Sequence, residues 1–395
     1  MKQNAIVVLD LGSRFVKGAM VNLAATDSQI QSCSRVQSNG IERGEIISIE
    51  ALEKSISDLF EELFQDCNAK PSRALVHVSP ASLKSFNSHG VIRVLRKDVS
   101  SYDIKRVLEV ACAVPMQKDE QIIHAIEQNY ALDYKPTQSR PIGMDGTRLE
   151  VNAHIVIAKK TALNLVKSLL KKYGITDVEI SFSAGAVAQL LTDDDKELGS
   201  VMLDIGHGVT NLIVVSQRMI YFSAVCPLGV SDVISAIADA FNLPEQTATK
   251  IFEQYASLSS KPGEAGVLEI QSDRGVYQID HAQLNRTIGE VYESLLQWVV
   301  DCLASLPQST KLTGGLHLTG GGSLVKGLGE FIQTKTNLDC NKTSYEKSLD
   351  FKTASPAEFS VLSGAVSQIL KDERQPILAS RSFIAKLKTL WYEHF

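Results

Sequence analysis

Two short stretches of the sequence place an aspartate at the end of an apolar run and a glycine two residues after it. They are AIVVLDLGSRFVKGAMV (residues 5–21) and VMLDIGHGVTNLIVV (residues 201–215), whose aspartates, Asp10 and Asp204, stand 194 positions apart. A carboxylate at the end of a strand suits a hard cation such as Mg²⁺, usually held through water. The glycine lets backbone N–H groups approach an anion with no Cβ in the way, and Lys17 could neutralise phosphate oxygens. These residues favour the binding of a phosphate group together with its metal ion.

Each stretch predicts two strands joined by a tight turn. In the first, strands over 5–9 and 15–21 flank a turn at 10–14, and in the second the turn covers 204–208. Because D-x-G is a common turn signal, either stretch alone could be an ordinary hairpin. Its recurrence after nearly half the chain favours a duplicated domain.

A third stretch, LHLTGGGSLVKGLGEFI (residues 316–332), predicts a short strand, a turn at 319–323 and a helix from about Leu324 to Ile332. A glycine triplet at a strand-to-helix turn lets the chain pass close to a flat ligand such as adenine and presents helix N-terminal amides. The Walker pattern G-x-x-x-x-G-K-[ST] is absent from the sequence. The stretch therefore indicates a ligand-binding turn of another kind.

Length and composition restrict the class of protein. At 395 residues the chain should divide into two or more domains, and a formal net charge of −5 argues against a nucleic-acid-binding protein. The six cysteines form no C-x-x-C pair, which is the usage expected in a reducing cytosol. We expect no secretory signal, because a strand-like run begins at residue 5, and no run of 18 apolar residues is present to span a membrane.

The stretch RSFIAKLKTLWYEHF (residues 381–395) has an amphipathic pattern. On a helix its apolar side chains fall within an arc of roughly 140°, with Lys386 at one edge and Arg381 and Lys388 at the other. Such a helix rises only about 22 Å, too little to span a bilayer. The residues alone leave two interpretations: a last helix packed on the protein's own core, or a helix that lies in the lipid headgroup region. The apolar residues are Phe383, Ile384, Leu387, Leu390, Trp391 and Phe395.

The two hairpins and the glycine turn, in this order, resemble the actin/Hsp70/sugar-kinase superfamily. The segments SFSAGAVAQLL (181–191) and PAEFSVLSGAVSQIL (356–370) resemble its connecting helices, because both place small residues where helices must cross closely. Residues 81–158 narrow the resemblance. Their H-x-I-x-Q-x-Y-x-L-D core and P-x-G-M-x-G-x-R-L turn are similar to a subdomain inserted in FtsA, a family of bacterial cell-division proteins. The resemblance runs from about residue 5 to residue 395.

This resemblance implies an α/β fold of the two-lobed actin-like ATPase type, with duplicated domains, a small inserted α+β subdomain and a C-terminal amphipathic helix. The expected division of the chain is a first lobe of residues 1–80, completed by 159–190 and 361–375; an inserted subdomain of 81–158; a second lobe of 191–230 and 301–360; a smaller subdomain of that lobe, 231–300; and a linker with a membrane-targeting helix, 376–395.

The resemblance also implies a function. FtsA proteins bind ATP with Mg²⁺, polymerise on the membrane, anchor the FtsZ ring to the cytoplasmic face of the inner membrane at the division septum, and help to recruit later division proteins. Turnover of ATP should be slow at most, with the nucleotide acting as a structural or switch ligand. The apolar residues of 381–395, with Lys386 and Lys388, would then contact anionic lipid. Arg274 and Arg286 are candidates to bind the acidic C-terminal tail of FtsZ.

By the same resemblance, Asp10 and Asp204 would hold Mg²⁺ through water, and no catalytic residue can be named. Gln189 could orient a water by analogy, and a role in helix packing is as good an interpretation. His207, Val209 and Asn211 depart from the D-I-G-G-G-T pattern of many relatives, which should spare the backbone cradle but alter the geometry for hydrolysis. The residues expected to bind the nucleotide are Asp10, Gly12, Ser13, Arg14, Lys17, Asp204, Gly206, His207, Gly208, Thr210, Gly320, Gly321, Gly322 and Ser323.

Two other classes remain as alternatives. A sugar-kinase-like phosphotransferase of the same superfamily needs a carboxylate base near its acceptor hydroxyl, and the sequence offers no convincing candidate. An FtsA-like pilus-assembly adaptor is the second alternative, a type that usually lacks the terminal helix.

Overall fold

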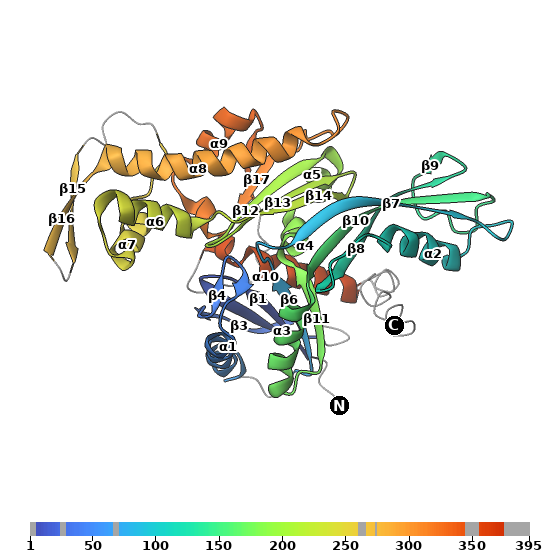
Figure 1. Cartoon of the computed structure of the whole chain (residues 1–395), viewed down its shortest axis with the longest axis horizontal. Coiled ribbons are helices and arrows are strands. Elements are labelled where there is room, and N and C mark those ends of the chain that lie inside the picture. The colour runs from blue at the N-terminus through green and yellow to red at the C-terminus, as the bar shows by residue number, and fades with distance from the viewer. Residues whose placement is uncertain are drawn as a thin grey trace.

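The fold is taken from a computed structural model, which describes residues 5–23, 29–65, 71–259, 266–272, 275–343 and 355–374. Three sheets of four or five strands form the body of the molecule (Figure 1). In this view the first sheet lies at the bottom, the second lies above it and the third extends to the right. A hairpin of β15 (Val267–Ser272) and β16 (Gly275–Asp280) marks the left end. The parts built on the first and second sheets are called the first and second lobes below.

The first lobe is built on a sheet with the strand order β11-β6-β1-β2-β3. Its central strand, β1, is buried along its whole length; it runs parallel to β6 and antiparallel to β2. A strand that is covered on both faces has an unbroken apolar sequence, so the apolar run at residues 5–9 predicts such a strand. The strands are β1 (Ala5–Leu11), β2 (Phe15–Asn22), β3 (Gln29–Gln37), β6 (Arg73–Val78) and β11 (Asp177–Phe182).

Two helices, α1 (Ile49–Phe64) and α3 (Lys160–Lys172), share an apolar core with this sheet. The buried residues of α1 include Leu52, Ile56, Leu59 and Leu63, the spacing of a helix that packs on one face. Before α1, the two-residue strands β4 (Ile41–Glu42) and β5 (Glu45–Ile46) form a small hairpin.

The second lobe repeats this design on a sheet with the order β14-β13-β12-β17-β18. Its central strand, β12, is also buried throughout, antiparallel to β13 and parallel to β17. The register repeats as well, because Asp204 is paired with Asn211 as Asp10 is paired with Lys17. The predicted duplication is therefore confirmed. The strands are β12 (Ser200–Ile205), β13 (Thr210–Ser216), β14 (Met219–Cys226), β17 (Leu316–Thr319) and β18 (Cys340–Lys342).

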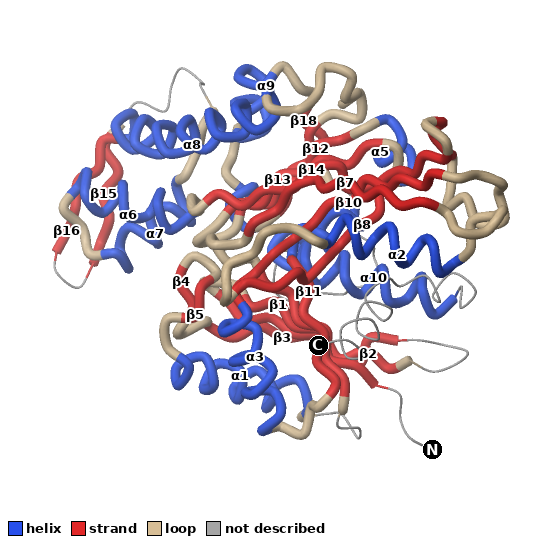
Figure 2. The backbone as a smooth tube through the Cα atoms, turned by 45° about the vertical axis from the view of Figure 1, so that its right-hand side comes forward, coloured by secondary structure: helices blue, strands red, loops and turns tan. Residues whose placement is uncertain are grey.

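The helices of the second lobe form one apolar core with its sheet. Residues of α6, α7 and α8 are buried together with residues of β12 and β17. Figure 2 shows α6 and α7 below α8, next to the β15–β16 hairpin. The helices are α5 (Asp193–Leu198), α6 (Val230–Phe241), α7 (Glu245–Tyr255), α8 (His281–Ala304) and α9 (Leu328–Thr336).

Two helices cross between the sheets of the two lobes. They are α4 (Ser183–Val187), which continues as the 3₁₀ turn η1 (Ala188–Leu190), and α10 (Ser360–Arg374), which follows the 3₁₀ turn η3 (Pro356–Phe359). Their apolar core contains Val8 of the first sheet and Met202 of the second. A Cβ at Gly364 would lie 1.9 Å from the Ala186 carbonyl oxygen. The close crossing predicted from the small residues is confirmed.

The third sheet, β7-β10-β8-β9, is antiparallel and follows β6 in the chain. Helix α2 (Ser101–Cys112) packs against it. Buried polar contacts tie this sheet to the second lobe: Gln128 Nε2 donates to the Tyr221 carbonyl oxygen at 3.1 Å, and His154 Nε2 lies 2.8 Å from Ser223 Oγ. The strands are β7 (Lys84–Arg93), β8 (Glu120–Leu132), β9 (Lys135–Thr137) and β10 (Arg148–Lys159).

The helix predicted from about Leu324 is wrong at its start. The glycine triplet leads into a 3₁₀ turn, η2 (Gly321–Leu324), then Val325 is extended, and α9 begins only at Leu328. Gly327 has a φ of 81°, a left-handed conformation that an α-helix interior does not contain. The triplet therefore does not open an α-helix.

Some predicted residues lie outside the described parts of the chain. These are Arg274 and the whole stretch 381–395. Among the helices that the structure describes, none has both the length and the apolar character needed to cross a membrane.

Candidate functional site

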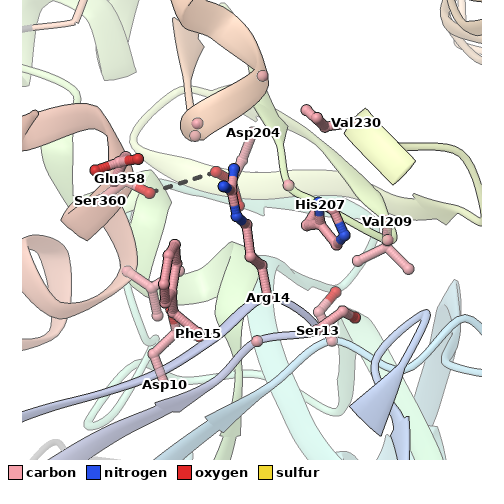
Figure 3. Close-up of a pocket in the computed structure, with 18 of the residues that line it drawn as sticks. Asp10, Ser13, Arg14, Phe15, Asp204, His207, Val209, Val230, Glu358 and Ser360 are labelled. Carbon is pink, nitrogen blue, oxygen red and sulfur yellow. Dashed lines mark hydrogen bonds between the residues drawn. The ribbon is translucent and has the colours of Figure 1, made fainter. Parts of the chain in front are cut away.

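A cavity of about 340 Å³ lies between the two lobes, where the turns of the repeated hairpins face each other (Figure 3). In Figure 3, Ser13 and Arg14 of the first hairpin lie opposite Asp204 and His207 of the second. Ligand pockets typically measure about 300–1,000 Å³, so the cavity can hold a small ligand. The predicted residues that line it are Asp10, Gly12, Ser13, Arg14, Lys17, Asp204, Gly206, His207, Gly208, Gly320, Gly321 and Gly322.

The first hairpin supplies a carboxylate and an ammonium group that are paired. Asp10 and Lys17 are register partners on β1 and β2, and Lys17 Nζ donates to Asp10 Oδ2 at 3.0 Å. Only 15% of the Lys17 side chain and 8% of the Asp10 side chain are exposed. The hairpin therefore fixes an ammonium and a carboxylate side by side at the cavity, and the ammonium is the group that suits phosphate oxygens.

The second hairpin holds Asp204 in the equivalent position among neutral hydrogen-bond partners. Asn211 Nδ2 donates to Asp204 Oδ2 at 3.1 Å, and Ser360 Oγ donates to Asp204 Oδ1 at 3.3 Å. Burial raises the pKa of Asp204 to about 6; the Asn211 hydrogen bond opposes this shift, and the Asp10 carboxylate adds to it. The folded chain thus keeps a buried carboxylate that a cation would stabilise.

Asp10 and Asp204 fit a magnesium ion that is shared with a phosphate ligand. Mg²⁺ at such sites is bound by one or two carboxylates, several waters and the phosphates of the ligand. A divalent cation near Asp204 would favour its ionised form and offset the effect of burial on its pKa. The donor set of this cavity is consistent with Mg²⁺ held through water.

The glycine triplet forms the wall of the cavity beside Asp204. Gly320 has a φ of 82°, and a Cβ there would lie 2.7 Å from Asp204 Oδ1. Glycine is therefore required for the turn to approach the carboxylate this closely. Tyr292 of α8 fixes the turn, because its hydroxyl donates to the Gly322 carbonyl oxygen at 2.8 Å.

Sequence reasoning missed the wall that α7 and η3 contribute. Phe252 and Glu253 of α7 line the cavity, and so do Ala256, which follows the helix, and Glu358 of η3. Phe252 is buried on α7 together with Ala248 and Ile251, a spacing that ordinary core packing also produces. The sequence pattern therefore could not distinguish a ligand-facing helix from a core-facing one.

Two of the ion pairs that join the lobes include residues that line this cavity. Arg14 of the first hairpin pairs with Glu253 of α7. Arg35 of β3 pairs with Glu358 at 2.7 Å, and its guanidinium lies over the Phe15 ring at 4.4 Å from the ring centroid. Each pair joins a basic residue of the first lobe to an acidic residue on the opposite wall.

The residues that depart from the common pattern are neutral or already paired. Burial lowers the pKa of His207 to about 4, and the nearby Arg14 lowers it as well, so its imidazole is neutral at pH 7 and a weak base. Asn211 forms a buried hydrogen bond with Ser79, which follows β6 of the first lobe. Neither residue supplies a strong general base.

Two of the predicted nucleotide-binding residues do not line the cavity, and their side chains bond to backbone groups near the turns. Thr210 is fully buried, and its Oγ1 donates to the Leu228 carbonyl oxygen at 2.8 Å. Ser323 Oγ donates to the Gly320 carbonyl oxygen at 2.7 Å. Their hydroxyls are therefore used in hydrogen bonds within the protein.

Two further candidate residues lie away from the cavity. Gln189 is part of η1 and does not line it; its Oε1 accepts a hydrogen bond from Lys196 Nζ at 3.5 Å. Arg286 is exposed on α8.

Known protein families match the chain over most of its length. Residues 80–157 match the SHS2 domain inserted in FtsA, and residues 201–380 match the cell division protein FtsA. The FtsA protein of Pseudomonas aeruginosa is 30% identical over 335 residues, which make up 83% of this chain and 80% of that protein.

Solved structures share the fold at low sequence identity. A chain of the PilM–PilN type IV pilus biogenesis complex aligns with a TM-score of 0.64 at 16% identity, covering 92% of this chain and 98% of that one. MreB5 of Spiroplasma citri bound to ADP aligns with a TM-score of 0.58 at 13% identity, covering 95% and 99%. With its two lobes and its repeated hairpins around one cavity, the chain has an actin-like ATPase fold. It belongs to the FtsA family of cell division proteins.

Proposed function

We propose that this chain binds ATP with Mg²⁺ between its lobes, polymerises on the membrane and anchors the FtsZ ring there, and helps to recruit later division proteins. The meeting of two aspartate-led hairpins and a glycine triplet at one cavity carries the nucleotide part of the proposal. Membership of the FtsA family supports the cellular part. MreB5, which has the same fold, was solved with ADP, and this also supports a nucleotide here.

The lining residues suggest how the nucleotide is held. Lys17 and Arg14 provide positive charge for the phosphate oxygens, and Asp10 and Asp204 hold the water shell of Mg²⁺. The glycine triplet and Phe252 offer flat and apolar surface to the base. When bound, Mg²⁺ neutralises phosphate charge and offsets the burial of Asp204.

We propose that turnover is slow at most. A general base must lie within hydrogen-bonding reach of the attacking water and have a pKa near the working pH. His207, with a pKa of about 4, does not meet this requirement, and Gln189 does not line the cavity. The nucleotide would then act as a structural or switch ligand that holds the two lobes together.

The membrane and FtsZ contacts are proposed for other parts of the chain. Residues 381–395 would lie in the headgroup region of the cytoplasmic membrane at the septum, with their lysines toward anionic lipid. A single short helix binds weakly, but the many copies in a filament multiply its effect. Arg286, exposed on α8, and Arg274 are proposed to bind the acidic FtsZ tail.

We keep the expected division of the chain into lobes, inserted subdomain and terminal helix as a proposal. The order of the strands along the chain supports it, because β7 to β10, which form the third sheet, come between β6 and β11 of the first sheet.

Asp204→Ala tests the nucleotide part of this proposal. The change removes a carboxylate that would order the waters of Mg²⁺, so calorimetric titration of the full chain with ATP in Mg²⁺ should show an affinity about tenfold lower or more. Asp58→Ala, at an exposed position of α1, is the control and should bind ATP as the unchanged chain does. An unaltered affinity in Asp204→Ala would remove this carboxylate from the site.

A further inference from the structure

The β4–β5 hairpin has a two-residue turn, Arg43–Gly44, in which both residues are left-handed. Their φ angles are 47° and 72°. Two-residue turns of this kind favour Asn and Gly, because a side chain at positive φ is sterically disfavoured. An arginine here is held in an unfavourable conformation, and contacts beyond the turn must stabilise it.

The backbone of this turn is fixed to the first lobe. Gly44 N donates to Ser13 Oγ of the first hairpin at 2.9 Å, and Ala81 N donates to the Arg43 carbonyl oxygen at 3.0 Å. A Cβ at Gly44 would lie 2.0 Å from the Ser79 carbonyl oxygen, so the turn packs directly on the chain that follows β6. The turn therefore moves together with the first hairpin.

The side chain of Arg43 crosses to the second lobe. Its Nη2 donates to Asp232 Oδ1 at 2.7 Å, and its Nη1 donates to the Pro227 carbonyl oxygen. Asp232 Oδ2 accepts a hydrogen bond from Gly229 N at 2.8 Å, at the start of α6. The Arg43 backbone also packs on the second hairpin, because a Cβ at Gly208 would lie 3.0 Å from Arg43 Cα.

The start of α6 is in turn bonded to the second hairpin. Val230 N donates to the Gly206 carbonyl oxygen at 3.1 Å, and Ser231 N donates to the His207 carbonyl oxygen at 2.8 Å. Arg43 therefore links the two hairpins through Asp232 and the Pro227 carbonyl oxygen, and neither of these residues lines the cavity.

We propose that Arg43 is a positioning residue that forms a latch with Asp232 and the Pro227 carbonyl oxygen. The latch holds the lobes at the spacing in which both hairpins reach one nucleotide. This inference rests on the proposed nucleotide site. When lobes exchange between open and closed states, the apparent affinity for a ligand scales with the closed fraction. Loss of the latch lowers that fraction and speeds nucleotide release.

The size of the effect follows from the exposure of the pair. The side chain of Arg43 is 41% exposed and that of Asp232 is 17% exposed, so solvent screens the interaction in part. Two hydrogen bonds from one guanidinium, one of them to a carboxylate, strengthen it. We expect nucleotide release to be about three- to tenfold faster without the latch.

Arg43→Gly is the informative variant, and the chain offers a matched control. Glycine removes the guanidinium and suits a φ of 47°, so the turn itself is retained. Arg218 has a φ of 65° in the two-residue turn between β13 and β14 and pairs with Glu197, so this pair lies within the second lobe. Arg218→Gly therefore removes the same side chain from another left-handed turn position without affecting a contact between lobes.

The first measurement is the dissociation rate of a fluorescent ATP analogue from the full chain in Mg²⁺. Arg43→Gly should release it three- to tenfold faster, and Arg218→Gly should not. Asp232→Asn keeps an oxygen for Gly229 N but loses the charge, so it should also speed release, and Arg43→Gly with Asp232→Asn should release no faster than Arg43→Gly alone. An unchanged rate in Arg43→Gly, or effects of the two changes that multiply, would overturn the proposal.

The second measurement is amide hydrogen exchange in the nucleotide-free chain. Arg43→Gly should speed exchange over residues 226–236, where α6 starts, and Arg218→Gly should leave it unchanged. If the unchanged chain binds no ATP analogue, the proposed nucleotide site is refuted. The exchange measurement still tests whether Arg43 holds the start of α6 to the first lobe. Exchange over 226–236 that is the same in Arg43→Gly and in the unchanged chain would refute it.

Discussion

Asp204→Asn should stabilise the nucleotide-free protein at neutral pH. Burial raises the pKa of Asp204 in the folded chain to about 6, whereas an aspartate in an unfolded chain titrates near 3.9. Between these values the folded state binds more protons, so stability falls as the pH rises from about 4 to about 6. A difference of about two pKa units corresponds to about 3 kcal/mol of lost stability above pH 6. Asparagine cannot ionise and keeps an oxygen for Asn211 Nδ2, so it avoids this loss.

Thermal denaturation between pH 4 and 8, with EDTA and without nucleotide, measures this effect. Above pH 7 the variant should melt several degrees higher than the unchanged chain, and the difference should shrink toward pH 5 and vanish near pH 4. Asp10→Asn is the matched control, because Asp10 holds the same place in the other hairpin but is paired with Lys17 at 3.0 Å. That change should lower the melting temperature, since it leaves a largely buried ammonium unpaired. The burial effect on Asp204 would be refuted if Asp204→Asn melted no higher than the unchanged chain at pH 7.5. It would also be refuted if the difference in melting temperature between the two grew toward pH 5.

Two further changes test the terminal amphipathic segment and the crossing of α4 and α10. Trp391→Glu should release the full chain from anionic liposomes, because burial of one large apolar side chain contributes roughly 1.5–3 kcal/mol, and it should leave the melting temperature nearly unchanged. If the unchanged chain does not float with liposomes and Trp391→Glu lowers the melting temperature, residues 381–395 form a helix packed on the protein's core. Gly364→Ala should lower the free energy of unfolding by about 1–3 kcal/mol, because its Cβ would lie 1.9 Å from the Ala186 carbonyl oxygen. Gly289→Ala in α8, where a Cβ meets only Leu258 at 3.8 Å, should be neutral or stabilising, and equal melting temperatures for these two variants would contradict the close crossing.

The parts of the site that could be predicted are those with a local cause. An apolar run that ends in D-x-G produces a buried strand and a tight turn from its own residues, so both hairpins were found with their aspartates in equivalent places. The small residues around Gly364 likewise indicate a close helix crossing wherever the second helix comes from.

The parts that could not be predicted depend on packing between distant segments. Phe252 and Glu253 face the cavity only because α6, α7 and α8 share a core with β12. The start of α9 was misplaced because Gly327 adopts a left-handed φ, and L-V-K-G-L-G also fits a helix. Arg43 gave no signal at all, since its partner Asp232 stands 189 positions away in the chain.

We propose that one nucleotide binds where the two hairpins and the glycine turn meet. Amide hydrogen exchange of the full chain, with and without saturating ATP in Mg²⁺, tests it most directly. We expect slower exchange over residues 10–17, 204–211 and 319–324 together when ATP is present, and no such change with Mg²⁺ alone. Exchange that ATP leaves unaltered in all three segments, or that it slows only elsewhere in the chain, would contradict the claim.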